Sequence, residues 1–218
     1  MADRVVLFVD YQNVYMAARQ AFDPSPRAIP HWEGQVDPLV LGQLLVTRSP
    51  FDRALTGVRM YRGLPDSTKD PKGYGACMRQ IATWSRPEEV QVVARPLRYP
   101  YGWPSTRQEA KGIDVSIAVD FVLMAARGDY DVGILMSADT DLKPALEAVV
   151  SLGAARVEVA AWSSQYGHSR RLAIKGRACG ATGSMTLNID LYKTLGTTPC
   201  LDQSWDHQSW LSPDAHVT

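Results

Sequence analysis

Acidic side chains follow two apolar runs of the sequence, at the points where a buried strand would end. The stretch VGILMSADTDLKPALEAV places Ser137, Asp139 and Asp141 after the run GILM and before an amphipathic segment. Near the N-terminus, the run RVVLFVD ends in Asp10, and Asn13 follows it. Like charges held this close repel each other unless a cation or hydrogen bonds stabilise them. We therefore ask which elements position these groups and whether they meet.

A further carboxylate, Asp114, stands at the start of the amphipathic stretch KGIDVSIAVDFVLMAARG. It continues a stripe that should face the sheet, formed by Ile117, Ala118, Phe121, Val122 and Ala125. A carboxylate on the inward side of a helix's first turn is costly unless a partner offsets its desolvation. Asp114 is therefore predicted to belong to the same site as the strand-end acids.

Each acid taken alone also has an ordinary structural explanation. Asp10 could form a turn, Asp141 could cap the helix that contains Pro144, and Asp114 could favour the helix dipole. Their coincidence at predicted strand ends favours a shared site. Four carboxylates directed at one crevice need a cation, and hard oxygen donors without His or Cys suit Mg²⁺ or Mn²⁺ rather than zinc. Such a metal commonly serves phosphoryl chemistry.

Short apolar runs alternate with helical patterns, which is typical of an α/β fold with a mostly parallel central sheet. Because ligands bind at the carboxyl ends of the strands in such sheets, the acids should lie together there. Strands are predicted within 4–10, 55–62, 89–99, 130–137 and 155–162. Helices are predicted over 11–22, 39–48, 74–85, 112–128 and 141–153.

The chain is expected to hold one domain over residues 1–198, followed by a tail over 199–218 that is weakly ordered or docked through Trp205 and Trp210. Its 218 residues include 23 basic and 23 acidic side chains, which argues against a polycation built for nucleic acid but not against local patches. Three cysteines without a CxxC spacing favour free thiols, and no stretch approaches a membrane span. A cytoplasmic protein is the expectation.

Other site chemistries lack their motifs. The chain has neither GxGxxG nor GxxxxGK[ST], so it lacks the phosphate cradles of dinucleotide-binding and P-loop proteins. DYQNV lacks the second aspartate of the aspartyl-phosphate enzymes, and the four histidines form no ligand spacing. The Gly-rich KDPKGYG is expected to be a mobile loop.

Together, VVLFVDYQNVYMAAR and KGIDVSIAVDFVLMAARGDYDVGILMSADTDLKPALEAVVSLG resemble the NYN domain, a branch of the PIN-like ribonucleases, over about Arg4 to Ala173. The resemblance implies a Rossmann-like three-layer α/β/α fold, Mg²⁺ or Mn²⁺, and hydrolysis of RNA phosphodiesters. Carried across, the metal-site acids would be Asp10, Asp114, Asp139 and Asp141, supported by Asn13 and Ser137. Ala138 and Thr140 stand where the family more usually has Gly and Ser, and neither change removes a carboxylate.

Cations near the rim of this site are the candidates for binding RNA. They are Arg62, Arg95, Arg98, Arg107 and Lys111, with Tyr99, Tyr101 and Trp103 available to stack on unpaired bases. The segment RPLRYPYGWPSTRQEAKG interleaves these cations and aromatics just before Asp114. A hairpin with a solvated charged face would show the same sequence pattern. HSRRLAIKGR, from His168 to Arg177, is a second basic run.

The sequence thus predicts a metal-dependent ribonuclease acting on single-stranded RNA, and assembly into a homo-oligomer is compatible with it. A catalytically silent module that binds RNA or protein is an alternative of another class, which the intact acids argue against. A DNA-directed nuclease is a further alternative, because residue types alone do not identify a reader of the 2′-OH. A phosphatase acting on small phosphomonoesters is the remaining one.

Overall fold

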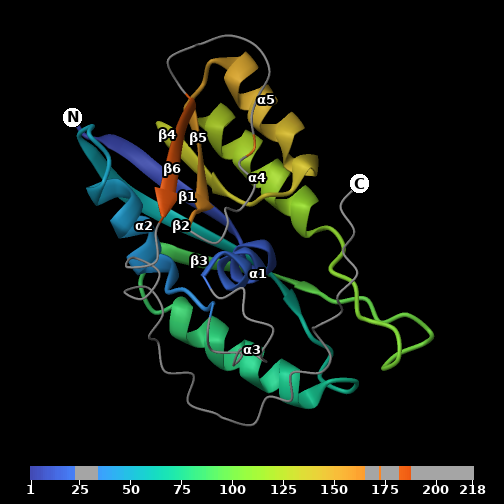
Figure 1. Ribbon diagram of the computed structural model, residues 1–218. Coiled ribbons are helices and arrows are strands. Elements are labelled where there is room, and N and C mark those ends of the chain that lie inside the picture. The colour runs from blue at the N-terminus through green and yellow to red at the C-terminus, as the bar shows by residue number, and fades with distance from the viewer. Residues whose placement is uncertain (23–33, 165–171, 173–181, 188–218) are drawn as a thin grey trace.

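The computed structural model describes residues 1–22, 34–164, 172 and 182–187. Within them, six parallel strands form one sheet in the order β3-β2-β1-β4-β5-β6 (Figure 1). The strands are β1 (Asp3–Asp10), β2 (Arg53–Leu64), β3 (Val90–Pro96), β4 (Val132–Met136), β5 (Arg156–Trp162) and β6 (Thr182–Leu187). The predicted α/β fold with a parallel sheet is confirmed. The sixth strand was not predicted, since TGSMTL is largely polar and carries a weak strand signal.

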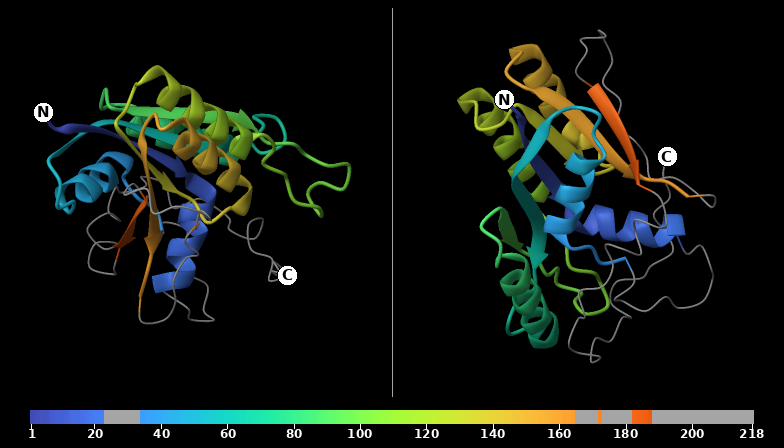
Figure 2. Two further views of the ribbon diagram at one scale, coloured as in Figure 1. Left: turned by 90° about the horizontal axis from the view of Figure 1, so that it is seen from above. Right: turned by 90° about the vertical axis from the view of Figure 1, so that its left-hand side faces the viewer.

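Helices cover both faces of the sheet (Figure 2). They are α1 (Tyr11–Phe22), α2 (Pro38–Thr47), α3 (Pro71–Trp84), α4 (Ile113–Arg127) and α5 (Lys143–Leu152). Alternate residues of β1 divide between the two layers, because successive side chains of a strand point to opposite faces. Val5, Leu7 and Val9 pack in the cluster of α1, α2 and α3, whereas Val6 and Phe8 pack in the cluster of α4 and α5.

The chain order in the sheet reverses at β1. From β1 the chain builds β2 and β3 on one side, and it then returns to place β4 on the other side of β1. The carboxyl ends of β1 and β4 therefore lie next to each other at a topological switch point, where open parallel sheets bind their ligands. Asp10 ends β1, and Ser137 follows β4 directly.

The Gly-rich segment at the start of α3 is not the loop that its composition indicated. Asp70 caps α3, its side chain accepting a hydrogen bond from the Gly73 N–H at 2.8 Å, and Pro71 starts the helix. A Cβ at Gly73 would lie 2.1 Å from Asp70 Oδ2, so glycine allows the cap to close. KDPKGYG is therefore a helix start, in which Pro at the first helical position is favourable.

Helix α4 matches its predicted stripe. Ile117, Phe121 and Ala125 are buried against the sheet, and Gly128 ends the helix with a φ of 70°. None of the helices within the described residues is long and apolar enough to cross a membrane.

Candidate active site

The Asp10 carboxylate is buried at the end of β1, with 6% of its surface exposed. Its Oδ1 accepts a hydrogen bond from the Asn13 N–H at 3.2 Å, and its Oδ2 accepts one from the Ser137 hydroxyl at 3.1 Å. Burial is the main cause that raises the pKa of Asp10 to about 6; the charges of Asp114 and Asp139 act in the same direction, and the two hydrogen bonds oppose them. Asp10 is therefore a fixed carboxylate that a nearby cation would stabilise in its charged form.

Hydrogen bonds connect the loop after β4 to the start of α1. Asn13 Oδ1 accepts from the Ala138 N–H at 2.9 Å, and Ser137 Oγ accepts from the Asp139 N–H at 3.1 Å. Ser137 thus links Asp10 to this loop, and Asn13 links the start of α1 to it. The resemblance to the NYN domain implied that both residues support the acids, and the structure places both between the two strand ends.

Asp139 and Asp141 differ in their local roles. Asp139 begins the short 3-10 helix η1 (Thr140–Leu142), and its Oδ1 accepts from the Asp141 N–H at 2.9 Å. The sequence allows Asp141 to cap the following helix, but α5 has no side-chain cap and Asp141 is exposed. The capping explanation therefore applies to Asp139. The carboxylate of Asp141 does not cap a helix.

Asp114 lies in the first turn of α4 and is half-buried. Its pKa is raised, first by burial, and then by the negative charges of Asp139 and Asp141. The pKa of Asp10 is likewise raised by the charges of Asp114 and Asp139, so acids from three segments of the chain act on Asp10 and Asp114. The structure thus brings the predicted acids to one end of the sheet.

The donor set fits a hard divalent cation in its chemistry. All four side chains offer carboxylate oxygens, and their mutual repulsion would be relieved by a positive ion. Within the residues that the structure describes, however, no three His, Cys, Asp or Glu side chains are arranged to hold a metal ion together. Ligation would therefore require a change in the side-chain arrangement of these acids.

Arg95 lies near the end of β3 and is bonded to α4. Its Nε donates a hydrogen bond to Ser116 Oγ at 2.9 Å, and the Ser116 hydroxyl donates to the Gly112 carbonyl at 2.7 Å. Arg95 is exposed, whereas Ser116 is buried in the first turns of α4. Arg95 is thereby tied to the helix turn that carries Asp114. The sequence carries no signal for this role of Ser116.

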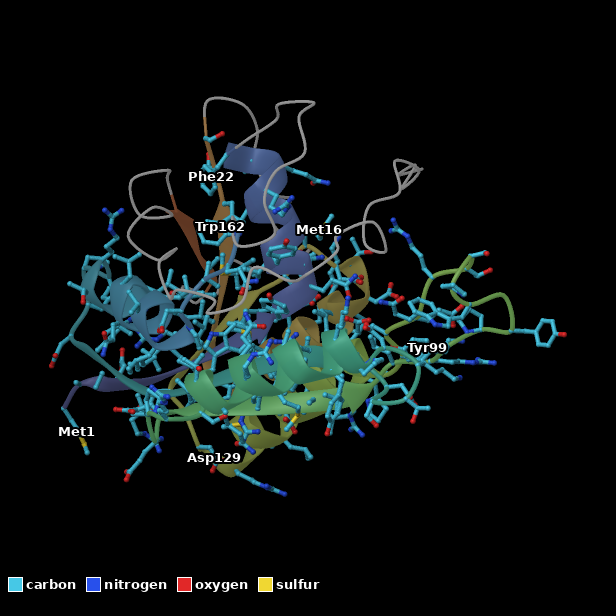
Figure 3. The ribbon with its side chains drawn as sticks, turned by 90° about the horizontal axis from the view of Figure 1, so that it is seen from below. Met1, Met16, Phe22, Tyr99, Asp129 and Trp162 are labelled. Atoms are coloured by element: carbon cyan, nitrogen blue, oxygen red, sulfur yellow. The ribbon has the colours of Figure 1, made fainter. Side chains whose placement is uncertain are left out.

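Residues 97–112 form an arm between β3 and α4, with Tyr99 near its base (Figure 3). The arm is closed by a single antiparallel bridge between Arg98 and Glu109, so the predicted hairpin is reduced to one pair. The Tyr99 and Trp103 rings are packed edge to face, with centroids 4.8 Å apart. Tyr99 is also held by the Asp66 N–H, which donates to its hydroxyl at 3.0 Å.

The remaining side chains of the arm are more available to solvent. Arg98, Arg107 and Lys111 are exposed, and Lys111 forms an ion pair with Glu109 at 3.3 Å. Tyr101 is fully exposed. The arm therefore presents cations and one free aromatic ring, while Tyr99 and Trp103 are partly occupied with each other.

Arg62 does not lie at the rim with the other cations. Only 7% of its surface is exposed, and its guanidinium lies 4.8 Å from the centre of the Tyr11 ring and 5.5 Å from that of Trp84. Its Nη1 donates to Gln80 Oε1. Tyr11 and Trp84 belong to the layer of α1, α2 and α3, across the sheet from α4. The residues around Arg62 were not identified from sequence, because two distant segments, α1 and α3, supply them.

Two sequence features lie mostly outside the described residues. They are the basic run from His168 to Arg177, of which only Leu172 is described, and the tail over 199–218.

Comparison with known proteins adds a family and a fold. The family model described as NYN domain matches residues 4–173. No match to a curated protein is found. The crystal structure of a protein of unknown function from Vibrio parahaemolyticus is similar to this chain, with 22% identity, a TM-score of 0.52, and coverage of 87% of this chain and 94% of that one. This likeness supports the fold.

Proposed function

Because the chain belongs to the NYN domain family, a branch of the PIN-like nucleases, we propose that it is a metal-dependent ribonuclease acting on single-stranded RNA. The observation that carries the proposal is the group of acids at the switch point of the sheet. Asp10 is buried there without a basic partner among the described residues, and its pKa and that of Asp114 are raised by burial and by neighbouring acids. Such perturbed carboxylates are costly and cluster at functional sites.

In this proposal Asp10, Asp114, Asp139 and Asp141 would hold Mg²⁺ or Mn²⁺. A divalent ion bound there would activate water and stabilise the charge that develops at phosphorus. Ser137 and Asn13 act as positioning residues. The Ser137 hydroxyl fixes Asp10 Oδ2, and Asn13 holds the loop after β4 by accepting from Ala138 N–H. Substituting either should therefore displace the acids without removing a carboxylate.

Substrate binding is assigned to the arm and to the end of β3. Arg95, Arg98, Arg107 and Lys111 would contact the RNA backbone, because phosphate contacts by Arg and Lys dominate affinity for nucleic acids. Trp103 and Tyr99 would stack on bases once an unpaired base displaces their mutual contact. Arg95 is bonded through Ser116 to the helix turn that carries Asp114.

A cleavage assay on three substrates tests the proposal. The protein is incubated with single-stranded RNA, with single-stranded DNA of the same sequence, and with p-nitrophenyl phosphate, each with Mg²⁺, Mn²⁺ or EDTA. We expect cleavage of RNA with metal only, and none by the Asp139→Asn variant, which controls for contaminating nucleases. Equal cleavage of DNA would replace the proposal with a general nuclease. Hydrolysis of only the phosphomonoester would indicate a phosphatase, and RNA binding without cleavage a silent module.

A further inference from the structure

Arg62 is a buried cation without an acidic partner among the described residues. Burying an unpaired charge is costly, and a nearby carboxylate usually compensates it. Arg62 has instead the faces of Tyr11 and Trp84 and a neutral amide, Gln80. Aromatic faces stabilise a guanidinium but leave its positive charge in place. The charge of Arg62 therefore remains available to an anion.

The hydrogen-bonding groups of Arg62 are only partly used. Its Nη1 donates to Gln80 Oε1, and its Nε makes a long contact of 3.5 Å with the Gly63 carbonyl. No described residue accepts a hydrogen bond from Nη2. This nitrogen is nevertheless not fully buried, so it retains some exposure to solvent. Gln80 is held in turn by contacts with Gln35 and with the Tyr11 hydroxyl. The guanidinium is thus pre-oriented, with one amino group that has no acceptor among the described residues.

The position of Arg62 connects it to the acids. Asp10 pairs with Tyr61 across β1 and β2, and Arg62 is the next residue of β2. Tyr11, whose ring covers Arg62, is the residue directly after Asp10, and consecutive Cα atoms lie about 3.8 Å apart. Arg62 and the acids therefore flank the carboxyl end of β1 from opposite layers of the fold.

We propose that Arg62 binds a backbone phosphate of the RNA next to the phosphodiester that is cleaved. This inference rests on the proposed function, and it assigns the enzyme a preference for oligonucleotides over a substrate with a single phosphodiester. A rigid guanidinium donates well to phosphate oxygens, and charge-assisted bonds of this kind are strong. The strand would cross the end of β1, with the reacting phosphate beside the acids and its neighbour beside Arg62.

The test neutralises one phosphate of the RNA at a time. A set of single-stranded RNAs is made in which each linkage in turn is a neutral methylphosphonate, and affinity is measured with Ca²⁺ in place of the catalytic metal. For the unsubstituted protein, one linkage adjacent to the cleaved one should matter most, with a loss of roughly tenfold or more. Arg62→Gln should lose affinity for the all-phosphate RNA by a similar factor and should be indifferent to that linkage.

Arg59→Gln is the matched control. Arg59 lies on the same strand, but it forms an ion pair with Asp120 at 3.2 Å on the α4 face. This variant should keep the full sensitivity to the neutral linkage. Arg62→Lys retains a charge without the planar fork and should fall between the unsubstituted protein and Arg62→Gln. Thermal unfolding of each variant identifies any loss that comes from misfolding.

The outcomes separate the two proposals. If RNA is cleaved but Arg62→Gln remains as sensitive to the adjacent linkage as the unsubstituted protein, the role of Arg62 is wrong and the ribonuclease stands. If the linkage effect depends on Arg62 but no RNA is cleaved with any metal, Arg62 binds phosphate in a protein that is not a nuclease. If the Arg62 variants do not fold, the scan of the unsubstituted protein decides. The inference is overturned if neutralising a linkage beside the cleaved one does not lower RNA affinity.

Discussion

The two ends of the sheet treat buried charges differently. At the amino end, the buried charges of Arg53 and Glu158 meet. At the carboxyl end, the buried charges of Asp10 and Arg62 do not. Arg53 and Glu158 form a two-pronged ion pair, with one contact of 3.0 Å, and their side chains are 2% and 8% exposed. At the carboxyl end, Asp10 lies with other acids, and Arg62 lies with aromatic rings.

The amino end follows the same rule at its surface. Arg4 pairs with Asp131 at 3.0 Å, and Arg156 pairs with Asp3. Charges that meet in pairs satisfy each other and need no ligand. A buried charge without a partner of opposite sign lowers the stability of the fold. A ligand of opposite charge would remove that cost. The comparison therefore assigns stability to the amino end and, under the proposed function, binding to the carboxyl end.

The largest effect is expected from an acid at the carboxyl end. Asp139→Asn should reduce RNA cleavage by roughly a thousandfold or more, on the scale of removing a preorganised electrostatic group from an active site. The free energy of unfolding of the metal-free protein should change little, because the asparagine oxygen can still accept from the Asp141 N–H. Cleavage rates and thermal melts without metal measure both. A large loss of stability would favour a purely structural cap.

The reverse result is expected at the amino end. Glu158→Gln should lower the free energy of unfolding by about 3 kcal/mol, because it leaves the Arg53 charge buried and unpaired. Urea unfolding measures the change. Cleavage per folded molecule should stay at the level of the unsubstituted protein. A drop in cleavage without a drop in stability would remove the distinction between the two ends.

The buried acid at the carboxyl end should make the free energy of unfolding depend on pH. In the metal-free protein the pKa of Asp10 is raised from 3.8 to about 6, so the folded state holds this proton more tightly than the unfolded state. Its contribution is therefore fully present below about pH 4 and is lost as the pH rises through 6, a loss of about 2–3 kcal/mol. Urea unfolding across this range checks the slope. Asp10→Asn should remove the loss, and saturating Mg²⁺ should oppose it.

The cations of the arm and of β3 should affect binding rather than chemistry. Replacing Arg95, Arg98 and Arg107 together with Ala should reduce the slope of log affinity against log salt by about 2, since each contact with a single strand contributes about 0.7. RNA affinity in a salt series with Ca²⁺ measures this. An unchanged slope would mean that the RNA passes elsewhere, and the run from His168 to Arg177 would be tested next.

The smallest effect is expected from an aromatic ring. Trp103→Ala should weaken RNA binding by about 1 kcal/mol and leave the salt slope unchanged, because stacking releases no counterions. The same titrations provide the measurement. Tyr101→Ala is the comparison, since this ring is fully exposed. A changed slope for Trp103→Ala would show that the substitution disturbs the arm and its cations.

Where a sequence pattern is local and periodic, it predicted the elements of this fold. The run RVVLFVD gave β1, whose residues Val5 to Val9 are almost fully buried, and the stripe through Ile117 and Phe121 gave α4. The patterns failed where local chemistry competes with composition. Gly73 suggested a loop, but it is the residue that lets Asp70 cap α3, and the polar TGSMTL pairs with β5 in spite of its weak strand propensity.

The sequence alone predicted that the acids stand at strand ends and at a helix start, and strand carboxyl ends meet at one edge of a parallel sheet. The environment of each charge was decided only by the tertiary structure. Arg62 and Arg95 look alike in sequence, but one is enclosed by Tyr11, Trp84 and Gln80, while the other reaches solvent beside α4. Burial and pairing depend on side chains from distant segments, and no local pattern records which of them will meet.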